Sequence, residues 1–261
     1  MGIINVTPDS FSDGGKFVEV NRAIDQGLRL VEEGADILDV GGESTRPYAT
    51  PISVDEERRR VGPVVARLCD AVDVPVSIDT YKADVAREAL LAGAEIINDV
   101  TGLTSDAEMV PLAVSTGAGV CAMHMPGTPQ TMQDDPTYTD VVEEIYRYLK
   151  ERRDSLLAAG MSPSRICLDP GVGFGKTDQH NLTILAHCAR FHALGTPLLV
   201  GHSRKGFIGK LLSDPSLDRT AGTIGVSLSL ARQGVQVVRV HDVAPIRQAL
   251  VLFNASGGID V

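Results

Sequence analysis

The sequence has no tryptophan, few aromatic residues and no excess of basic residues. Phe, Trp and Tyr make up 4% of the 261 residues, and 24 Lys and Arg stand against 34 Asp and Glu, for a formal net charge of −10. Nucleic acids and anionic membrane surfaces bind basic protein surfaces, so this charge excludes both as partners. An anionic small molecule would bind only where cations gather locally.

The sequence also lacks paired cysteines and long apolar runs. Its four cysteines include no Cys-x-x-Cys pair, and two of them lie in strand-like apolar runs, which is typical of reduced core thiols. Uninterrupted apolar runs are far shorter than the roughly 18 residues that cross a membrane. The start has no basic segment before an apolar one, so we expect no signal peptide. These absences predict a cytoplasmic protein.

Eight short apolar runs alternate with helical patterns. Residues 34–39 and 93–98 share one pattern, in which a glycine ends a helix and a strand-like run follows. The eight runs are Gly2–Asn5, Ile37–Val40, Val74–Ile78, Glu95–Asn98, Gly119–Met123, Arg165–Leu168, Pro197–Val200 and Gln236–Val240. This alternation predicts parallel βαβ units, and eight strands can close a barrel. No Pro/Ser-rich linker divides the chain, so we predict one TIM (β/α)8 barrel domain over 1–261, with a doubly wound sheet as the alternative.

Polar residues follow the predicted strands, where the active sites of such barrels lie. Carboxylate and amide oxygens suit the donor edge of a polar heterocycle, and the predicted acceptors are Asp79, Asn98 and Asp169. Cations suit phosphate or carboxylate, and the predicted ones are Arg46, Lys205, Arg239 and His241. The Asn5 amide can ligate Mg²⁺ if phosphate oxygens share the ion. These parts predict a site for a flat nitrogen heterocycle that carries phosphate.

The run from Gly171 to Thr177 is similar to a phosphate-binding P-loop, but Pro170 stands where that motif needs its first glycine. Its glycine spacing also differs from the dinucleotide-binding pattern. We therefore interpret it as a loop after the sixth strand. No histidine pair has zinc-ligand spacing, so we predict no zinc site.

Four motifs together resemble the dihydropteroate synthase family. They are Asn-Val-Thr-Pro-Asp-Ser-Phe-Ser-Asp-Gly-Gly at 5–15, Gly-Glu-Ser-Thr-Arg-Pro at 42–47, Asp-Pro-Gly-Val-Gly-Phe-Gly-Lys at 169–176 and Ser-Arg-Lys-Gly-Phe-Ile-Gly at 203–209. The resemblance extends from residue 1 to about residue 250. It implies a folate-pathway transferase that joins (7,8-dihydropterin-6-yl)methyl diphosphate to 4-aminobenzoate and releases diphosphate.

The resemblance also implies roles for individual residues. The pterin is expected on Asp79, Asn98, Met123, Asp169, Phe174 and Lys205, and the diphosphate on Thr45, Arg239, Val240 and His241. The aminobenzoate is expected against Phe11, Thr45, Pro47, Lys205 and Gly206. The residues expected to act in catalysis are Asp79, Asp169, Lys205, Asp13 and Arg46. Asn5 would bind Mg²⁺, the expected cofactor, and the family pattern implies a homodimer.

The sequence departs from the family at several places. The first strand begins at the first residues, so we expect a late start site or a trimmed N-terminus. Tyr48 stands where glycine is common and Gly206 where serine is common, next to the expected aminobenzoate pocket. Residues 174–176 show no insertion of the kind seen in sulfonamide-resistant relatives, so we expect this protein to be sensitive to sulfonamides. Two alternatives are a methyltetrahydrofolate methyltransferase-like barrel and a non-catalytic pterin-binding protein.

Overall fold

All eight predicted strands are present in the computed structural model, which describes residues 1–7, 16–214 and 216–258. The strands are β1 (Gly2–Asn5), β2 (Leu38–Gly41), β3 (Val76–Asp79), β4 (Ile96–Asp99), β5 (Gly119–Met123), β6 (Ile166–Asp169), β7 (Leu199–Val200) and β8 (Val237–Val238). Strands β1 to β6 form one parallel sheet in chain order, and β7 pairs in parallel with β8.

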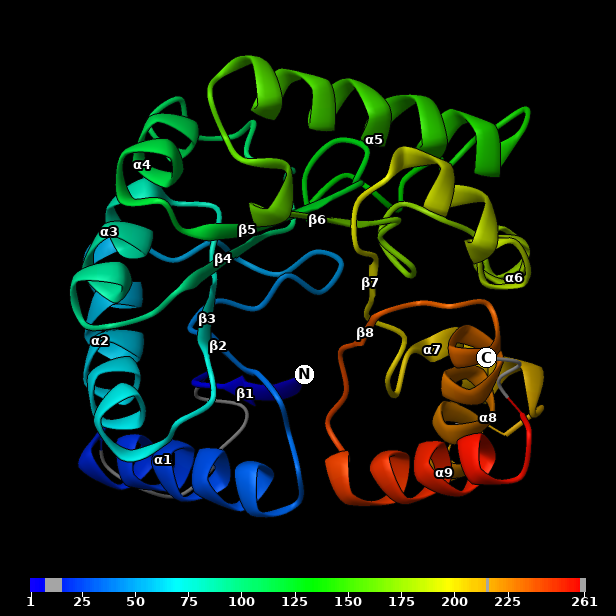
Figure 1. Cartoon of the computed structure of the whole chain (residues 1–261), viewed down its shortest axis with the longest axis horizontal. Coiled ribbons are helices and arrows are strands. Elements are labelled where there is room, and N and C mark those ends of the chain that lie inside the picture. Colours follow the sequence, from blue (N-terminus) through cyan, green and yellow to red (C-terminus); the bar gives the residue numbers. More distant parts are fainter. Residues whose placement is uncertain (8–15, 215, 259–261) are drawn as a thin grey trace.

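Two isolated parallel bridges join these two sheets at both edges. Gly2 of β1 bridges to Val240 just after β8, and Leu168 of β6 bridges to Leu198 just before β7. Backbone hydrogen bonds of 3.0 Å support each junction, from the Ile3 N–H to Val240 O and from the Leu168 N–H to Pro197 O. The strands therefore close into a barrel, which Figure 1 shows with the helices outside. The predicted TIM barrel is confirmed.

The strand β7 is shorter than predicted. The sequence predicts strand from Pro197, whereas regular pairing begins only at Leu199. Pro197 has no N–H, and the Leu198 N–H donates to the Gln236 side chain at 2.8 Å, so regular backbone pairing starts only at Leu199. The Pro197 carbonyl still accepts from Leu168 at the junction with β6.

Helices follow the strands around the outside of the barrel (Figure 1). In the described part of the chain they are α1 (Lys16–Glu32), α2 (Val54–Ala71), α3 (Ala83–Leu91), α4 (Met109–Thr116), α5 (Val141–Ala158), α6 (Asp178–Ala186), α7 (Gly206–Leu211), α8 (Thr220–Arg232) and α9 (Val243–Ala255). Short 3₁₀ helices cover Pro163–Arg165 and Cys188–Leu194. Ser53 caps α2, its Oγ accepting from the Glu56 N–H at 3.2 Å. Within the described residues, no helix combines the length and apolar character needed to cross a bilayer.

The apolar core lies between the strands and the surrounding helices. Strand residues such as Ile4, Val40, Ile78 and Ile97 are fully buried there. A second, smaller apolar cluster lies after the ends of β4, β5 and β6. It contains Val100, Met123, Met125 and Met132, with Tyr81 and Phe174 packed against it. This cluster gives the strand ends an apolar wall.

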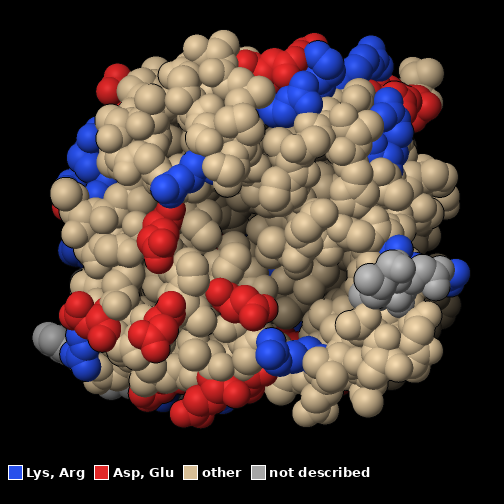
Figure 2. Space-filling model, viewed as in Figure 1, with Lys and Arg blue, Asp and Glu red and all other residues tan. Residues whose placement is uncertain are grey.

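Charged side chains are unevenly spread over the face seen in Figure 2. Acidic residues gather near α1, whereas basic and acidic residues lie side by side over α5. The outer helices together carry about as many basic as acidic residues, so most of the net charge of −10 lies in the strands and loops.

Candidate active site

Asp39, in β2, joins polar side chains from three other strand ends. Its Oδ2 accepts from Arg239 Nε at 2.6 Å and from Asn98 Nδ2 at 3.0 Å. Arg239 Nη2 also donates to Asp79 Oδ2 at 2.6 Å, so one guanidinium pairs with two carboxylates. Asp39 is completely buried, and its Oδ1 has no hydrogen-bond partner. With Asp169 and Lys205, these four residues form what we call the strand-end site.

Burial shifts the pKa values of two carboxyls and one lysine in the strand-end site towards neutral pH. It raises the pKa of Asp79 to about 7, although Arg239 opposes the shift. It raises the pKa of Asp169 to about 6, although the Gly171 N–H donates to Asp169 Oδ1 at 2.7 Å. Burial also lowers the pKa of Lys205 to about 7, against the attraction of Asp169. Such shifted groups at strand ends are typical of functional sites.

Lys205 is held against the loop that follows β6. Its Nζ donates to Val172 O and lies 4.0 Å from the centre of the Phe174 ring, a cation–π contact. Gly173, between these two residues, has a φ of 82°, and a Cβ there would lie 2.5 Å from Lys205 Cδ. Glycine at 173 therefore allows both the backbone turn and the close approach of the lysine.

His241 follows β8 and contacts Ser203, which follows β7. The His241 N–H donates to Ser203 Oγ at 3.2 Å, and His241 Nδ1 lies 3.0 Å from the same oxygen. Burial lowers the pKa of His241 to about 4, and Arg204, Arg239 and Arg46 lower it further. At neutral pH the ring is uncharged, so it would bind an anion as an N–H donor.

His202 anchors the segment that carries Ser203 and Lys205. It is fully buried, with Nε2 at 2.9 Å from Ser227 Oγ and 3.1 Å from Thr223 O, both in α8. Its own carbonyl accepts from the Lys205 N–H at 3.3 Å. Burial lowers the pKa of His202 to about 4, below the value of about 6.5 expected in the unfolded chain.

We expect His202→Gln to change how stability depends on pH. The folded pKa lies below the unfolded one, so the contribution of His202 is present above pH 6.5 and is lost as pH falls towards 4. Between pH 7.5 and 4.5, wild type should lose about 2.5 kcal/mol relative to the variant. Urea unfolding of both proteins at the two pH values measures this difference. A difference that is the same at both values would contradict the prediction.

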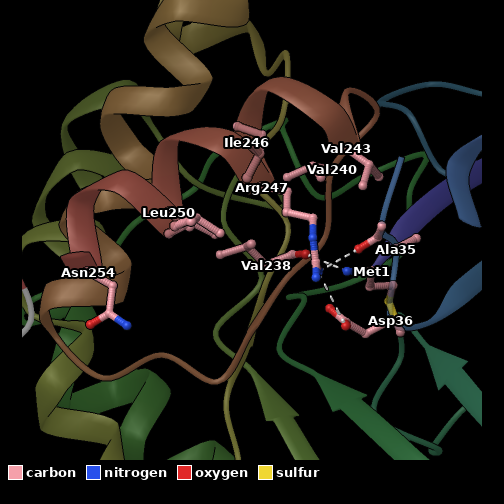
Figure 3. A pocket seen from close by; sticks show the side chains of 12 residues that line it. Met1, Ala35, Asp36, Val238, Val240, Val243, Ile246, Arg247, Leu250 and Asn254 are labelled. Atoms are coloured by element: carbon pink, nitrogen blue, oxygen red, sulfur yellow. Dashed lines mark hydrogen bonds and ion pairs between the residues drawn. The ribbon is translucent and has the colours of Figure 1, made fainter. Parts of the chain in front are cut away.

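A cavity lies at the other end of the barrel, beside the start of β1 (Figure 3). It holds about 370 Å³, and its lining includes Met1, Ala35, Val240, Ile246 and Leu250. Arg247 at its rim donates to Gly34 O at 3.0 Å. Its lining is mainly apolar, whereas catalysis in this fold takes place at the C-terminal ends of the strands. We therefore place the active site at the strand-end site.

A model of the pterin-binding enzyme family matches residues 1–241. Dihydropteroate synthase of Escherichia coli K12 is 45% identical over 256 residues, which cover 98% of this chain and 90% of that protein. The chain belongs to the dihydropteroate synthase family.

Solved structures agree with this assignment. Dihydropteroate synthase of Xanthomonas albilineans with 4-aminobenzoic acid is 46% identical, with a TM-score of 0.93, and the match covers 100% of this chain and 93% of that one. The Yersinia pestis dihydropteroate synthase in complex with a sulfonamide drug is 43% identical, with a TM-score of 0.92, and the match covers 98% and 93%. Dihydropteroate synthases are transferases, so the sequence-based prediction of the enzyme class is confirmed.

The structure brings together most of the residues predicted for the site in this chain. Asp79, Asn98, Asp169, Lys205 and Arg239 meet at the strand-end site. Met123 is the strand partner of Asp169, and both Met123 and Phe174 belong to the apolar wall. Asn5 ends β1, and Val240 and His241 follow β8. The predicted Phe11 and Asp13 lie outside the described residues.

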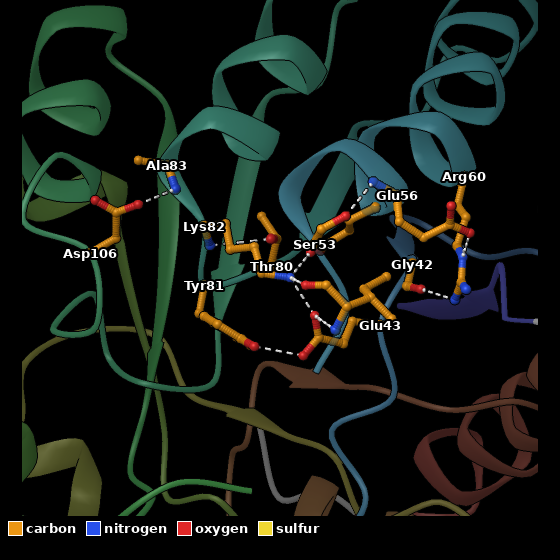
Figure 4. Close-up of polar contacts among 12 residues, drawn as sticks. Gly42, Glu43, Ser53, Glu56, Arg60, Thr80, Tyr81, Lys82, Ala83 and Asp106 are labelled. Carbon is orange, nitrogen blue, oxygen red and sulfur yellow. Dashed lines mark hydrogen bonds and ion pairs between the residues drawn. The ribbon is translucent and has the colours of Figure 1, made fainter. Parts of the chain in front are cut away.

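The predicted residues Thr45, Arg46 and Pro47 lie in the loop between β2 and α2. Thr45 is half-buried, and Arg46 and Pro47 are exposed. Buried charges fix the base of this loop (Figure 4). Glu43 accepts from the Tyr81 hydroxyl at 2.6 Å and pairs with Lys82.

Lys82 also donates to the buried Glu57 at 2.6 Å, and burial raises the pKa of this carboxyl. The base of the loop is thus tied to both α2 and the end of β3.

The two departures from the family pattern have different surroundings. Tyr48 adopts a left-handed φ of 63°, its N–H donates to Pro129 O at 3.0 Å, and its hydroxyl to Asp134 Oδ1 at 3.4 Å. This residue therefore ties its loop to the segment after β5. Gly206 begins α7, and a Cβ there would meet no atom within 4 Å, so a serine would fit.

Sequence reasoning missed Asp39 as a site residue. It stands five positions after Gly34, as Asn98 stands after Gly93, so the repeated pattern placed both at strand ends. No local pattern indicates that Asp39 pairs with Arg239, which lies 200 residues away. The predicted carboxylates Asp79 and Asp169 are therefore joined at the strand ends by a third one, Asp39.

Proposed function

We propose that the strand-end site carries the family's reaction in this chain, joining (7,8-dihydropterin-6-yl)methyl diphosphate to 4-aminobenzoate. The amine nitrogen forms a bond to the pterin methylene carbon, the bond from that carbon to the diphosphate oxygen breaks, and the amine loses one proton. The observation that supports this most is the set of buried acceptors, Asp79, Asn98 and Asp169, beside Lys205 and an apolar wall.

The pterin would lie with its N–H edge towards these acceptors. Asn98 Nδ2 already donates to Asp39, which leaves the Asn98 oxygen to accept from a ligand. Met123 and Phe174 would contact the flat ring, with Lys205 at its side. A polar heterocycle gains both hydrogen bonds and apolar contact in such a pocket.

The diphosphate would lie near Thr45, Arg239, Val240 and His241. Among the described residues, no group of three His, Cys, Asp or Glu side chains could hold a metal by itself. Asn5 ends β1, beside Gly41 of β2. One amide oxygen fits a Mg²⁺ ion that is bound mainly by the diphosphate, and we propose Asn5 as its protein ligand. Bound Mg²⁺ would neutralise charge on the leaving group.

The chain's own residues suit a reaction that needs little proton transfer. An arylamine is neutral at pH 7 and already nucleophilic, so no strong base is required. Asp79 and Asp169 would stabilise positive charge that develops on the pterin methylene, while Arg239 and His241 would bind the departing diphosphate. The aminobenzoate would bind against Phe11, Thr45, Pro47, Lys205 and Gly206. Arg46 and Asp13 would complete the site.

One assay tests this function. The protein is mixed with the dihydropterin diphosphate, 4-aminobenzoate and Mg²⁺, and diphosphate release is followed. Release should need both substrates and Mg²⁺, and a sulfonamide should inhibit in competition with 4-aminobenzoate. Pterin binding without release would indicate the non-catalytic alternative.

We also propose that two copies of the chain associate through α7, α8 and α9. These helices lie together in Figure 1. Helices α7 and α9 and the α7–α8 connection expose large apolar side chains, namely Leu211 (65%), Leu212 (48%), Leu217 (47%), Val251 (58%) and Leu252 (69%). Exposed apolar surface of this kind is typical of a protein interface. Sedimentation should show a dimer, and Leu212→Glu should shift it to monomer. A monomeric wild type would contradict the proposal.

A further inference from the structure

Lys176 is a buried lysine that the proposed reaction does not use. Its side chain is only 2% exposed, although it lies in the run that is similar to a phosphate-binding loop. Its Nζ donates to Phe174 O at 2.7 Å and lies 3.0 Å from His124 Nδ1 and 3.4 Å from His124 O. The Lys176 amine therefore contacts groups of the protein itself, at Phe174 and His124.

Three acceptors match the three donors of an ammonium group. Burial, together with the nearby Lys176, lowers the pKa of His124 to about 2, so the ring is neutral and its Nδ1 can accept. Burial also lowers the pKa of Lys176, while Asp169 raises it. The amine thus lies where the protein's own oxygens and one ring nitrogen replace water.

These contacts join the loop after β6 to the end of β5. The His124 N–H donates to Asp169 O at 2.9 Å, and the Tyr138 hydroxyl donates to Gly175 O at 2.9 Å. Lys205 holds the same loop at Val172 O and lies over the Phe174 ring. The two lysines therefore fix neighbouring parts of one loop.

We propose that Lys176 is a positioning residue for pterin binding, because it fixes the backbone of Phe174 and thereby the ring that would lie against the pterin. This inference rests on the proposed function, which places the pterin beside Phe174. Lys176 does not touch substrate in this proposal. Its loss would let the backbone at Phe174 shift, and with it the ring that would lie against the pterin.

The test compares Lys176→Met with Lys176→Gln. Methionine keeps an unbranched side chain of similar length but cannot donate, whereas the amide of glutamine can still donate to Phe174 O. We expect the Kd for 6-hydroxymethylpterin to rise about 10-fold in Lys176→Met and less in Lys176→Gln. KM for the pterin diphosphate should rise in parallel, and KM for 4-aminobenzoate should stay within about 2-fold.

Lys150→Met is the matched control, because Lys150 is an exposed lysine on α5 that pairs with Asp154. It should leave all three constants unchanged. If Lys176→Met does not fold, Lys176→Gln carries the test. Wild-type pterin affinity in the folded variants, or an equal rise in both KM values, would overturn the inference. The proposed function fails separately, if wild type binds 6-hydroxymethylpterin but releases no diphosphate.

Discussion

Replacing Arg239 with methionine is expected to lower the free energy of unfolding by about 3–5 kcal/mol, the usual effect of removing one partner from a buried ion pair. Arg239 pairs with Asp39 and Asp79, whose side chains are 0% and 14% exposed. Without the guanidinium, two carboxylates would remain buried side by side with no cation bonded to them. Urea denaturation at pH 7.5 measures the loss.

The double variant Arg239→Met with Asp39→Asn identifies the cause of that loss. It removes one of the two unpaired charges and leaves a side chain that can still accept from Asn98. Stability should recover in part, while turnover should stay low because the diphosphate has lost a cation. A single variant as stable as wild type would show that the pairing is energetically neutral.

Asp79→Asn should lower kcat by about 100-fold or more, the effect of removing one preorganised electrostatic group from an active site. Asp79 is the acidic residue that both pairs with Arg239 and lies beside the proposed pterin. Neutral asparagine keeps the shape but loses the charge that would stabilise a developing cation. Steady-state rates of diphosphate release at saturating substrate measure the change.

The stability of Asp79→Asn should match or exceed that of wild type at pH 8. The folded pKa of Asp79, about 7, lies above the unfolded one, so its contribution to stability is lost as pH rises through 7. Asp84→Asn is the matched control, since Asp84 is a 67% exposed residue of α3 and its change should alter neither rate nor stability. Unchanged turnover in Asp79→Asn would remove Asp79 from the mechanism.

Local patterns were sufficient to predict the strands and the helical segments between them. Apolar runs after glycines 34 and 93 became β2 and β4, with boundaries within one or two residues. The predicted length of β7 was wrong by two residues, because regular pairing needs backbone N–H groups that donate to the carbonyls of the neighbouring strand.

The members of the strand-end site other than Asp39 were predictable, but the pairing of their side chains was not. Parallel strands in chain order bring their C-terminal ends together, so Asp79, Asn98 and Asp169 had to meet once the barrel was assigned. Tyr48 and Gly206 could be singled out from sequence, but only the structure shows that Tyr48 bonds to the segment after β5 and that Gly206 has open space.

By itself, the sequence determined the eight strands, their order and the polar residues that end them, because these follow from local periodicity and turn chemistry. The tertiary structure decided which charges neutralise one another. Asp39 and Arg239 are 200 residues apart, and Lys176 lies 52 residues from His124. Such contacts depend on closing the barrel and excluding water, and the strength of each pairing depends on that exclusion. Burial in the closed barrel also sets the shifted pKa values of Asp79, Asp169 and Lys205.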